Sequence, residues 1–166
     1  MPNFEIQYVL LGALAIALVV AAATDIHRRQ IDNWLNAAIA IAAPAWWWAS
    51  GMDPWPDMAI QLGLAIITFA VCAGLFAMRA MGGGDVKLLA ALALWITPAW
   101  FLKLILMMSL LGGLLTIILA LWHGLRRRRE RLAIPYGVAI ASAGLWALAS
   151  QFVFPAQSAL PAGALG

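Results

Sequence analysis

Long apolar runs alternate with short polar stretches along almost the whole chain. A helix needs about 20 apolar residues to cross about 30 Å of hydrocarbon, and several of these runs approach that length. The pattern predicts six membrane spans, at residues 6–24, 34–50, 58–78, 88–100, 102–122 and 135–154. We therefore expect an all-α polytopic membrane protein. Residues 1–166 would form a single membrane-embedded domain, with residues 155–166 as a flexible tail.

Two details of these runs affect the expected fold. Pro98 interrupts the fourth run, and because proline ends or kinks a helix, this span is either short or continues to Trp100. The second run carries three consecutive tryptophans near its far end, at positions 46–48. Tryptophan favours the headgroup level of a bilayer, so the triplet predicts an interfacial belt.

The composition agrees with a membrane protein, since 65% of the 166 residues are hydrophobic and only 10% are charged. A water-soluble domain of this size needs a more polar surface. The formal net charge is +3, but the basic residues form short clusters between apolar runs instead of one basic aqueous face, so nucleic acid is not an expected partner. The single cysteine, Cys72, lies inside an apolar run. It allows no intrachain disulfide and supports no cysteine metal site, and we expect neither metal nor cofactor.

The basic residues fall on one side of the membrane if there are six spans. The loops after the first, third and fifth spans carry Arg28, Arg29, Arg79, Lys87, Arg126, Arg127, Arg128, Arg129 and Arg131. The opposite side carries Lys103 together with Glu5, Asp53 and Asp57. An excess of Lys and Arg marks the cytoplasmic side. Both termini are therefore predicted to lie outside the cytoplasm.

Two acidic residues stand at this predicted cytoplasmic side. Asp25 follows the first apolar run, and Asp85 ends the glycine run Gly82-Gly83-Gly84. A carboxylate beside the hydrocarbon layer is costly and is by default a hint of function. The sequence therefore makes Asp25 and Asp85 the candidate catalytic residues.

Two carboxylates held close together cannot both ionise cheaply, so the pair retains one proton. The ionised member can take a proton from water while the protonated member polarises a peptide carbonyl, which is general acid–base hydrolysis. Gly82 and Gly84 would let a substrate strand approach the acids closely. Lys87 would support this loop, either by biasing the charge of the pair or by binding substrate.

Structural roles remain open for the same residues. Asp85 is also placed to cap the fourth span, Asp25 to sit at the interface beside arginines, and Lys87 to anchor the helix at the cytoplasmic side. Asn33, with Asp32, is placed to cap the second span. The stretch 135–137 either shapes a cavity near the acids or simply begins the last helix, where proline is tolerated.

Three stretches resemble signatures of the type IV prepilin leader peptidases, which are polytopic aspartyl proteases. Gly82-Gly83-Gly84-Asp85-Val86-Lys87 resembles their G-x-G-D-x-K motif. The stretch from Asp25 to Asn33 resembles their first aspartate region, with Asp32 where the family usually has proline. Ile134-Pro135-Tyr136-Gly137-Val138-Ala139 resembles a Pro-Tyr-Gly signature at the start of the last span.

The resemblance implies catalysis by Asp25 and Asp85, with Asn33, Pro135, Tyr136 and Gly137 shaping the cavity. It implies an aspartic endopeptidase that removes the basic leader from prepilin or pseudopilin precursors at the cytoplasmic face of the bacterial inner membrane. The lipid bilayer and pilus assembly machinery would be further partners. Larger members methylate the new N-terminus through an added region with cysteine pairs. This chain starts almost directly with its first span and has one cysteine, so it is similar to the short, peptidase-only branch of Flp or tight-adherence pilus systems, and methylation is not expected.

Two other functions fit the sequence. One is a related glycine-aspartate membrane protease with a different substrate. The other is a proton-coupled carrier, or a non-enzymatic membrane component of a secretion or pilus assembly machine, in which the acids act as a relay. Both acids lie near a membrane face, whereas carriers tend to place their sites near the midplane.

Overall fold

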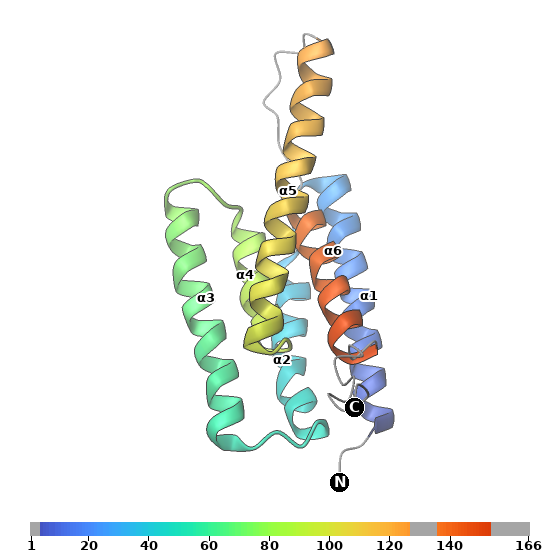
Figure 1. Cartoon of the computed structure of the whole chain (residues 1–166), viewed down its shortest axis with the longest axis vertical. Helices are drawn as coiled ribbons and strands as arrows, with labels where there is room; N and C mark the ends of the chain where they lie inside the picture. Colours follow the sequence, from blue (N-terminus) through green and yellow to red (C-terminus); the bar gives the residue numbers. More distant parts are fainter. Residues whose placement is uncertain (1–3, 127–135, 154–166) are drawn as a thin grey trace, which may run out of the picture.

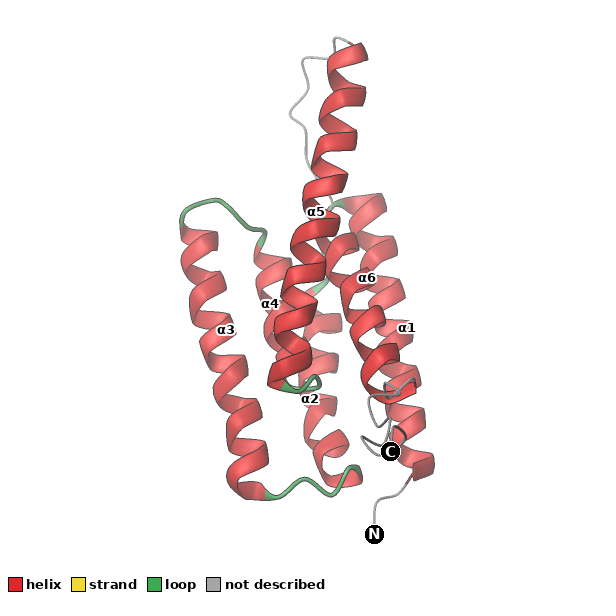
Figure 2. Ribbon diagram, viewed as in Figure 1, coloured by secondary structure: helices red, strands yellow, loops and turns green. Residues whose placement is uncertain are grey.

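The structure, a computed structural model, describes residues 4–126 and 136–153. These residues are helical, with short connections and no strand in the described part (Figures 1 and 2). The helices are α1 Phe4–Arg28, α2 Asn33–Ala49, α3 Ala59–Ala77, α4 Gly83–Ala93, α5 Pro98–Arg126 and α6 Tyr136–Leu148. Two π-helical turns, η1 Pro54–Met58 and η2 Ala149–Val153, adjoin α3 and α6. The predicted all-α fold is confirmed.

Successive helices run up and down in a bundle, so that the end of α1 and the starts of α4 and α6 lie at the same end (Figure 1). The helix α4 is the centre of the packing, because α2, α3 and α6 all contact it, while α6 also packs on α1 and α5. Leu88, Leu89 and Leu92 of α4 are almost completely buried. The helices that carry Asp25 and Asp85 are thus connected through a common core.

The fourth helix differs from the expected span at 88–100. It starts earlier, at Gly83, and ends at Ala93, while Pro98 begins α5. The fixed backbone angle of proline suits the first turn of a helix, and its missing N–H is not needed there. Pro98 therefore starts the long fifth helix instead of interrupting the fourth, and Trp100 belongs to α5.

The helices fall into two length classes. Among the residues that the structure describes, three helical stretches are able to cross a membrane on their own by length and apolar composition: Phe4–Arg28, Pro54–Ala77 and Pro98–Ile118. The other helices are shorter, and α4 with its 11 residues is only about 17 Å long. Long apolar helices around a short buried one define a polytopic membrane protein.

Side chains of α2 and α3 bind carbonyl groups in the turn that follows α4, between Ala93 and Pro98. Buried carbonyl groups need a hydrogen-bond partner. Trp47 Nε1 donates to the Leu94 carbonyl at 2.7 Å, and Gln61 Nε2 donates to the Ile96 carbonyl at 2.8 Å. The short helix can therefore end inside the bundle without leaving these two acceptors unpaired.

The sequence predicted that the tryptophan triplet forms an interfacial belt. In the structure the three rings do not face the same way. Trp46 is buried and stacks on Trp95 with ring centroids 5.8 Å apart, Trp47 is half-buried, and Trp48 is 85% exposed. Consecutive residues of a helix point in directions about 100° apart, so the three rings cannot share one face. Only Trp48 is free to meet the surroundings of the bundle.

Candidate active site

Asp25 lies in the last turn of α1 and is buried, with 6% of its surface exposed. Its carboxylate faces the start of α6, where the Val138 N–H donates to Asp25 Oδ2 at 3.3 Å. The first N–H groups of a helix have no partner within the helix and favour a negative charge. The end of α1 and the start of α6 thus combine to hold a carboxylate inside the bundle.

Asp85 lies in the first turn of α4 and is half-buried. Gly82 is the N-cap residue of this helix in an extended conformation, and no side chain caps the helix. Burial, and then the negative charge of Asp25, raise the pKa of Asp85 to about 6, while the backbone N–H of Gly82 opposes the shift. The two carboxylates therefore interact electrostatically, as a catalytic pair requires.

A polar cavity of about 320 Å³ contains both carboxylates. It lies between the connection from α1 to α2 and the start of α4, and its walls are Asp25, Arg29, Gln30, Ile31, Asp32, Asn33, Gly82, Gly83, Gly84 and Asp85. The structure thus brings together the two candidate acids, the expected glycines and Asn33. Residues from two distant parts of the sequence form one site.

At two glycine positions an added side chain would meet one of the two carboxylates. A Cβ atom on Gly137 would lie 2.7 Å from Asp25 Oδ2 and 2.9 Å from Ile31 Cδ1. A Cβ atom on Gly82 would lie 2.9 Å from Asp85 Oδ2. Such distances are shorter than van der Waals contact, so both glycines provide space for a carboxylate. Gly137 thus lies against Asp25, but it is not among the residues that line the cavity, and its expected cavity-shaping role stays a prediction.

The supporting residues differ from the expected loop. Gly82 precedes α4, but Gly84 and Lys87 lie within it. Gly84 packs on Ile31, since a Cβ atom there would be 3.1 Å from the Ile31 Cβ. Lys87 is exposed and its Nζ donates to Asn33 Oδ1 at 2.7 Å. Lys87 therefore fixes Asn33 from outside the cavity and is not part of its wall.

The remaining expected residues have other positions. Tyr136 packs on Gly112 of α5, where a Cβ atom would lie 3.2 Å from the tyrosine ring, and it is absent from the described wall of the cavity. Pro135 lies outside the described residues, as do the tail 155–166 and the arginines at 127–131. Asp32 is the N-cap residue of α2, but its side chain makes no capping bond and its carbonyl accepts from Leu35 and Asn36.

Three contributors to the site were not predicted from the sequence. Val138 donates to Asp25 through its backbone, Ile31 packs between Gly84 and Gly137, and Asn36 Nδ2 donates to the Gly84 carbonyl at 3.2 Å. The Asn36 contact had a signal in the sequence, because Asn33 and Asn36 share one face of a helix at a spacing of three residues. The other two contacts depend on the three-dimensional packing.

Within residues 4–126 and 136–153, no group of three or more His, Cys, Asp or Glu side chains is placed to hold a metal ion. The cavity holds two carboxylates, and the Val138 N–H donates to one of them. Paired carboxylates in a polar cavity can activate water by general acid–base catalysis.

Fold and site together define a polytopic helical membrane protein with a two-carboxylate site at one end of the bundle. The sequence profile of the type IV leader peptidase family matches residues 12–121, and the chain belongs to this family. The match covers both Asp25 and Asp85 and confirms the family that the sequence motifs indicated. No curated protein and no solved structure matches the chain. The protein is thus a membrane peptidase of the type IV leader peptidase kind.

Proposed function

We propose that the chain is an aspartic endopeptidase that removes the basic leader from Flp-like type IV prepilins at the cytoplasmic face of the bacterial inner membrane. The observation that carries the proposal is the common cavity of Asp25 and Asp85. Its walls contain three aspartates, including Asp32, and one arginine, Arg29. This excess of negative charge favours a basic leader over a neutral or acidic one.

The two carboxylates divide the work of hydrolysis. Asp25, which accepts from the Val138 N–H, acts as the ionised base, and Asp85, whose pKa is raised, holds the shared proton. Asp25 takes a proton from water as the water oxygen attacks the scissile carbonyl carbon, and Asp85 gives its proton to the carbonyl oxygen. The product of this step is a neutral gem-diol.

Collapse of the gem-diol completes the reaction. Asp25 passes its proton to the amide nitrogen, Asp85 takes a proton from one hydroxyl group, and the carbon–nitrogen bond breaks. A carboxylic acid and an amine leave, and the pair again holds one proton. No covalent enzyme intermediate forms, and the step needs no cofactor.

The distribution of basic residues supports a cytoplasmic site. Arg28, Arg29, Arg79 and Lys87 lie at the end of the bundle that carries the two acids, and α5 extends past its neighbours at the same end (Figure 1). The connection at the other end carries Asp53 and Asp57. Basic residues are enriched on the cytoplasmic side of membrane proteins.

The proposal covers leader removal without N-methylation. The 166 residues contain one cysteine, Cys72, which is buried in α3. They contain no region of paired cysteines like the one that the resemblance associates with methylation in larger family members. Mass spectrometry of the cleaved precursor would therefore find an unmodified new N-terminus.

The test is cleavage of the cognate prepilin by the purified protein in phospholipid vesicles. Asp25→Asn and Asp85→Asn should each lower the rate by at least about 100-fold, because general acid–base catalysis contributes about 10² to 10⁴. Asp53→Asn is the matched control, an exposed acid at the other end of the bundle, and should cleave normally. Normal cleavage by either site variant would disprove the two-aspartate mechanism.

A further inference from the structure

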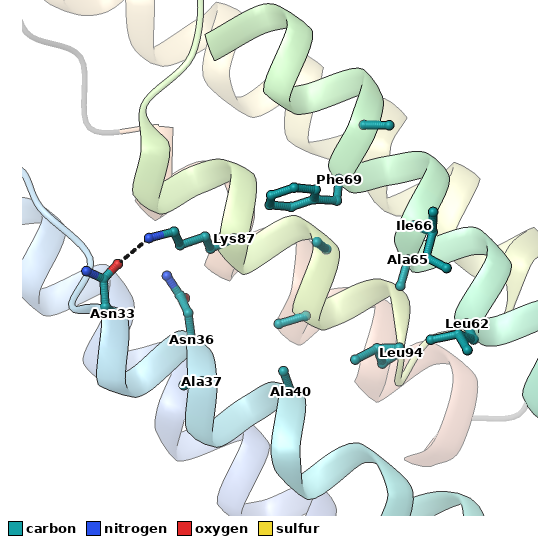
Figure 3. Close-up of a pocket in the computed structure, with 13 residues that line it drawn as sticks. Asn33, Asn36, Ala37, Ala40, Leu62, Ala65, Ile66, Phe69, Lys87 and Leu94 are labelled. Atoms are coloured by element: carbon teal, nitrogen blue, oxygen red, sulfur yellow. Dashed lines mark hydrogen bonds between the residues drawn. The ribbon is translucent and has the colours of Figure 1, made fainter. Parts of the chain in front are cut away.

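An apolar groove of about 590 Å³ runs between α2 and α3, with α4 as its floor (Figure 3). It exists because α3 packs mainly on α4, which leaves α2 and α3 as opposite walls. Most of the lining is apolar: small alanines come from α2 and α4, and larger residues such as Ile66 and Phe69 come from α3. Small side chains let a helix backbone approach closely.

The groove adjoins the catalytic cavity. Asn33 lines both of them, and Lys87, which lines the groove, donates to the Asn33 side chain at 2.7 Å (Figure 3). From this end the groove follows α2 as far as Ala40 and α4 as far as Leu94. The eight residues from Asn33 to Ala40 correspond to about 10 Å, or two helical turns.

The polar end of the groove holds an acceptor without a partner. Asn36 is 96% buried, and its Nδ2 donates to the Gly84 carbonyl. Its Oδ1 has no hydrogen-bond partner among the described residues. A buried unpaired acceptor costs free energy. The Oδ1 atom is itself buried, so a backbone N–H in the groove satisfies it once the Asn36 side chain has turned toward the groove. A lipid chain has no donor to offer there.

We propose that this groove binds an apolar helical segment of the substrate, the segment that follows the scissile bond. The inference rests on the proposed function, because the groove begins beside the cavity where the peptide bond would be cut, and its apolar lining fits an apolar helix. A helix in this position has its first turn beside Asn36, where its unpaired N–H groups are available. About two turns of the helix lie against α2, α3 and α4, and the bond to be cut lies at the cavity.

The test fills the groove without touching the catalytic cavity. Ala37 of α2 is exposed and lines the groove, while Ala45 of the same helix is equally exposed and lies outside its lining. Ala37→Phe should lower kcat/KM for the cognate prepilin by about ten-fold or more, mainly through KM, because it removes binding made before the chemical step. Ala45→Phe should leave kcat/KM unchanged. An unchanged KM in Ala37→Phe would overturn the proposal.

A binding measurement separates this proposal from the proposed function. A photo-crosslinking amino acid at position 37, in the Asp85→Asn variant, is mixed with the cognate prepilin in vesicles. We expect crosslinks to the apolar segment of the prepilin, and no such crosslinks from position 45. Crosslinks from position 37 only to lipid, or to a second copy of the chain, would overturn the groove assignment even if the wild type cleaves. Crosslinks without any wild-type cleavage would refute the peptidase mechanism and leave the groove assignment standing.

Discussion

The space for the Asp25 carboxylate depends on the glycine at position 137, which has no side chain. A Cβ atom there would lie 2.7 Å from Asp25 Oδ2 and 2.8 Å from its Cγ. The carboxylate would have to move away from the Val138 N–H that now donates to it. Because α1 and α6 are packed together at this point, neither helix can yield easily.

Gly137→Ala should therefore lower the cleavage rate by about 10-fold to 100-fold, since a displacement of about 1 Å at a catalytic group has effects of that size. The thermal unfolding of the purified variant should also show a loss of about 1–3 kcal/mol from overpacking. Gly113→Ala is the control, because a Cβ atom at position 113 has no neighbour within 4 Å. Full activity in Gly137→Ala would mean that Asp25 is not held by α6 during catalysis.

The acid pair also predicts a pH dependence. Burial and the charge of Asp25 raise the pKa of Asp85 to about 6, so the pair keeps its shared proton below that pH and loses it above. A pair with two charges cannot protonate the scissile carbonyl. The rate of prepilin cleavage should thus decline as the pH rises above about 6, approaching ten-fold per pH unit.

The neighbouring imidazole of His27 is the control for this profile. His27 is exposed and lies two residues after Asp25. His27→Gln should keep the same pH profile if the acid pair, which titrates as a unit, sets it. A profile that disappears in His27→Gln would mean that the acid pair does not set it.

At the scale of elements, the short helix α4 depends on its neighbours. Trp95, which follows α4, is 2% exposed, stacks on Trp46 and donates from Nε1 to the Ile39 carbonyl at 2.9 Å. These contacts connect the C-terminal end of α4 to α2. A helix of 11 residues is marginal by itself, so its position relies on such contacts.

Trp95→Phe should lower the free energy of unfolding by about 2 kcal/mol, through a lost buried hydrogen bond and a cavity. Thermal unfolding in detergent measures the effect. Trp48→Phe is the matched control, since Trp48 is 85% exposed and lies on α2. Equal unfolding temperatures for the two variants would mean that Trp95 does not stabilise the junction of α2 and α4.

The apolar runs predicted the helices well where each helix is long and contacts few others, as in α1 and α3. They failed at α4, which ends at Ala93. The turn after it is held by Trp47 and Gln61, which bind carbonyl groups within that turn. No local pattern carries that information. Pro98 was noticed in the sequence, but whether it breaks one helix or begins the next depends on the packing around it.

The site was likewise predicted only in part. Asp25 and Asp85 were predicted to lie on the same side of the membrane because two predicted spans separate them, so the chain crosses the bilayer and returns. The partner of Asp25 was not predicted, since Val138 lies 113 residues further along the chain and only the packing of α6 on α1 brings it near. The groove was missed for a related reason: it arises from the separation of α2 and α3, which a single sequence does not specify.

At the scale of the whole molecule, the proposed function requires both acids at one membrane face. The connection after α1 and the connection after α3 lie at the same end of the bundle (Figure 2), and residues of both line one cavity. Asp57 of η1 lies in the connection between α2 and α3, at the opposite end. Labelling at one position in each of these three connections therefore reports the membrane orientation of the chain.

Single cysteines at Gln30, Ala80 and Asp57, all exposed, test this orientation in intact cells. Gln30→Cys and Ala80→Cys should react only with a membrane-permeant thiol reagent, whereas Asp57→Cys should also react with an impermeant one. The wild-type chain is the control, because its Cys72 is buried and should stay unlabelled. Opposite labelling of positions 30 and 80 would put Asp25 and Asp85 on different sides of the bilayer. No common proton could then pass between them, and a peptidase built on this pair would be impossible.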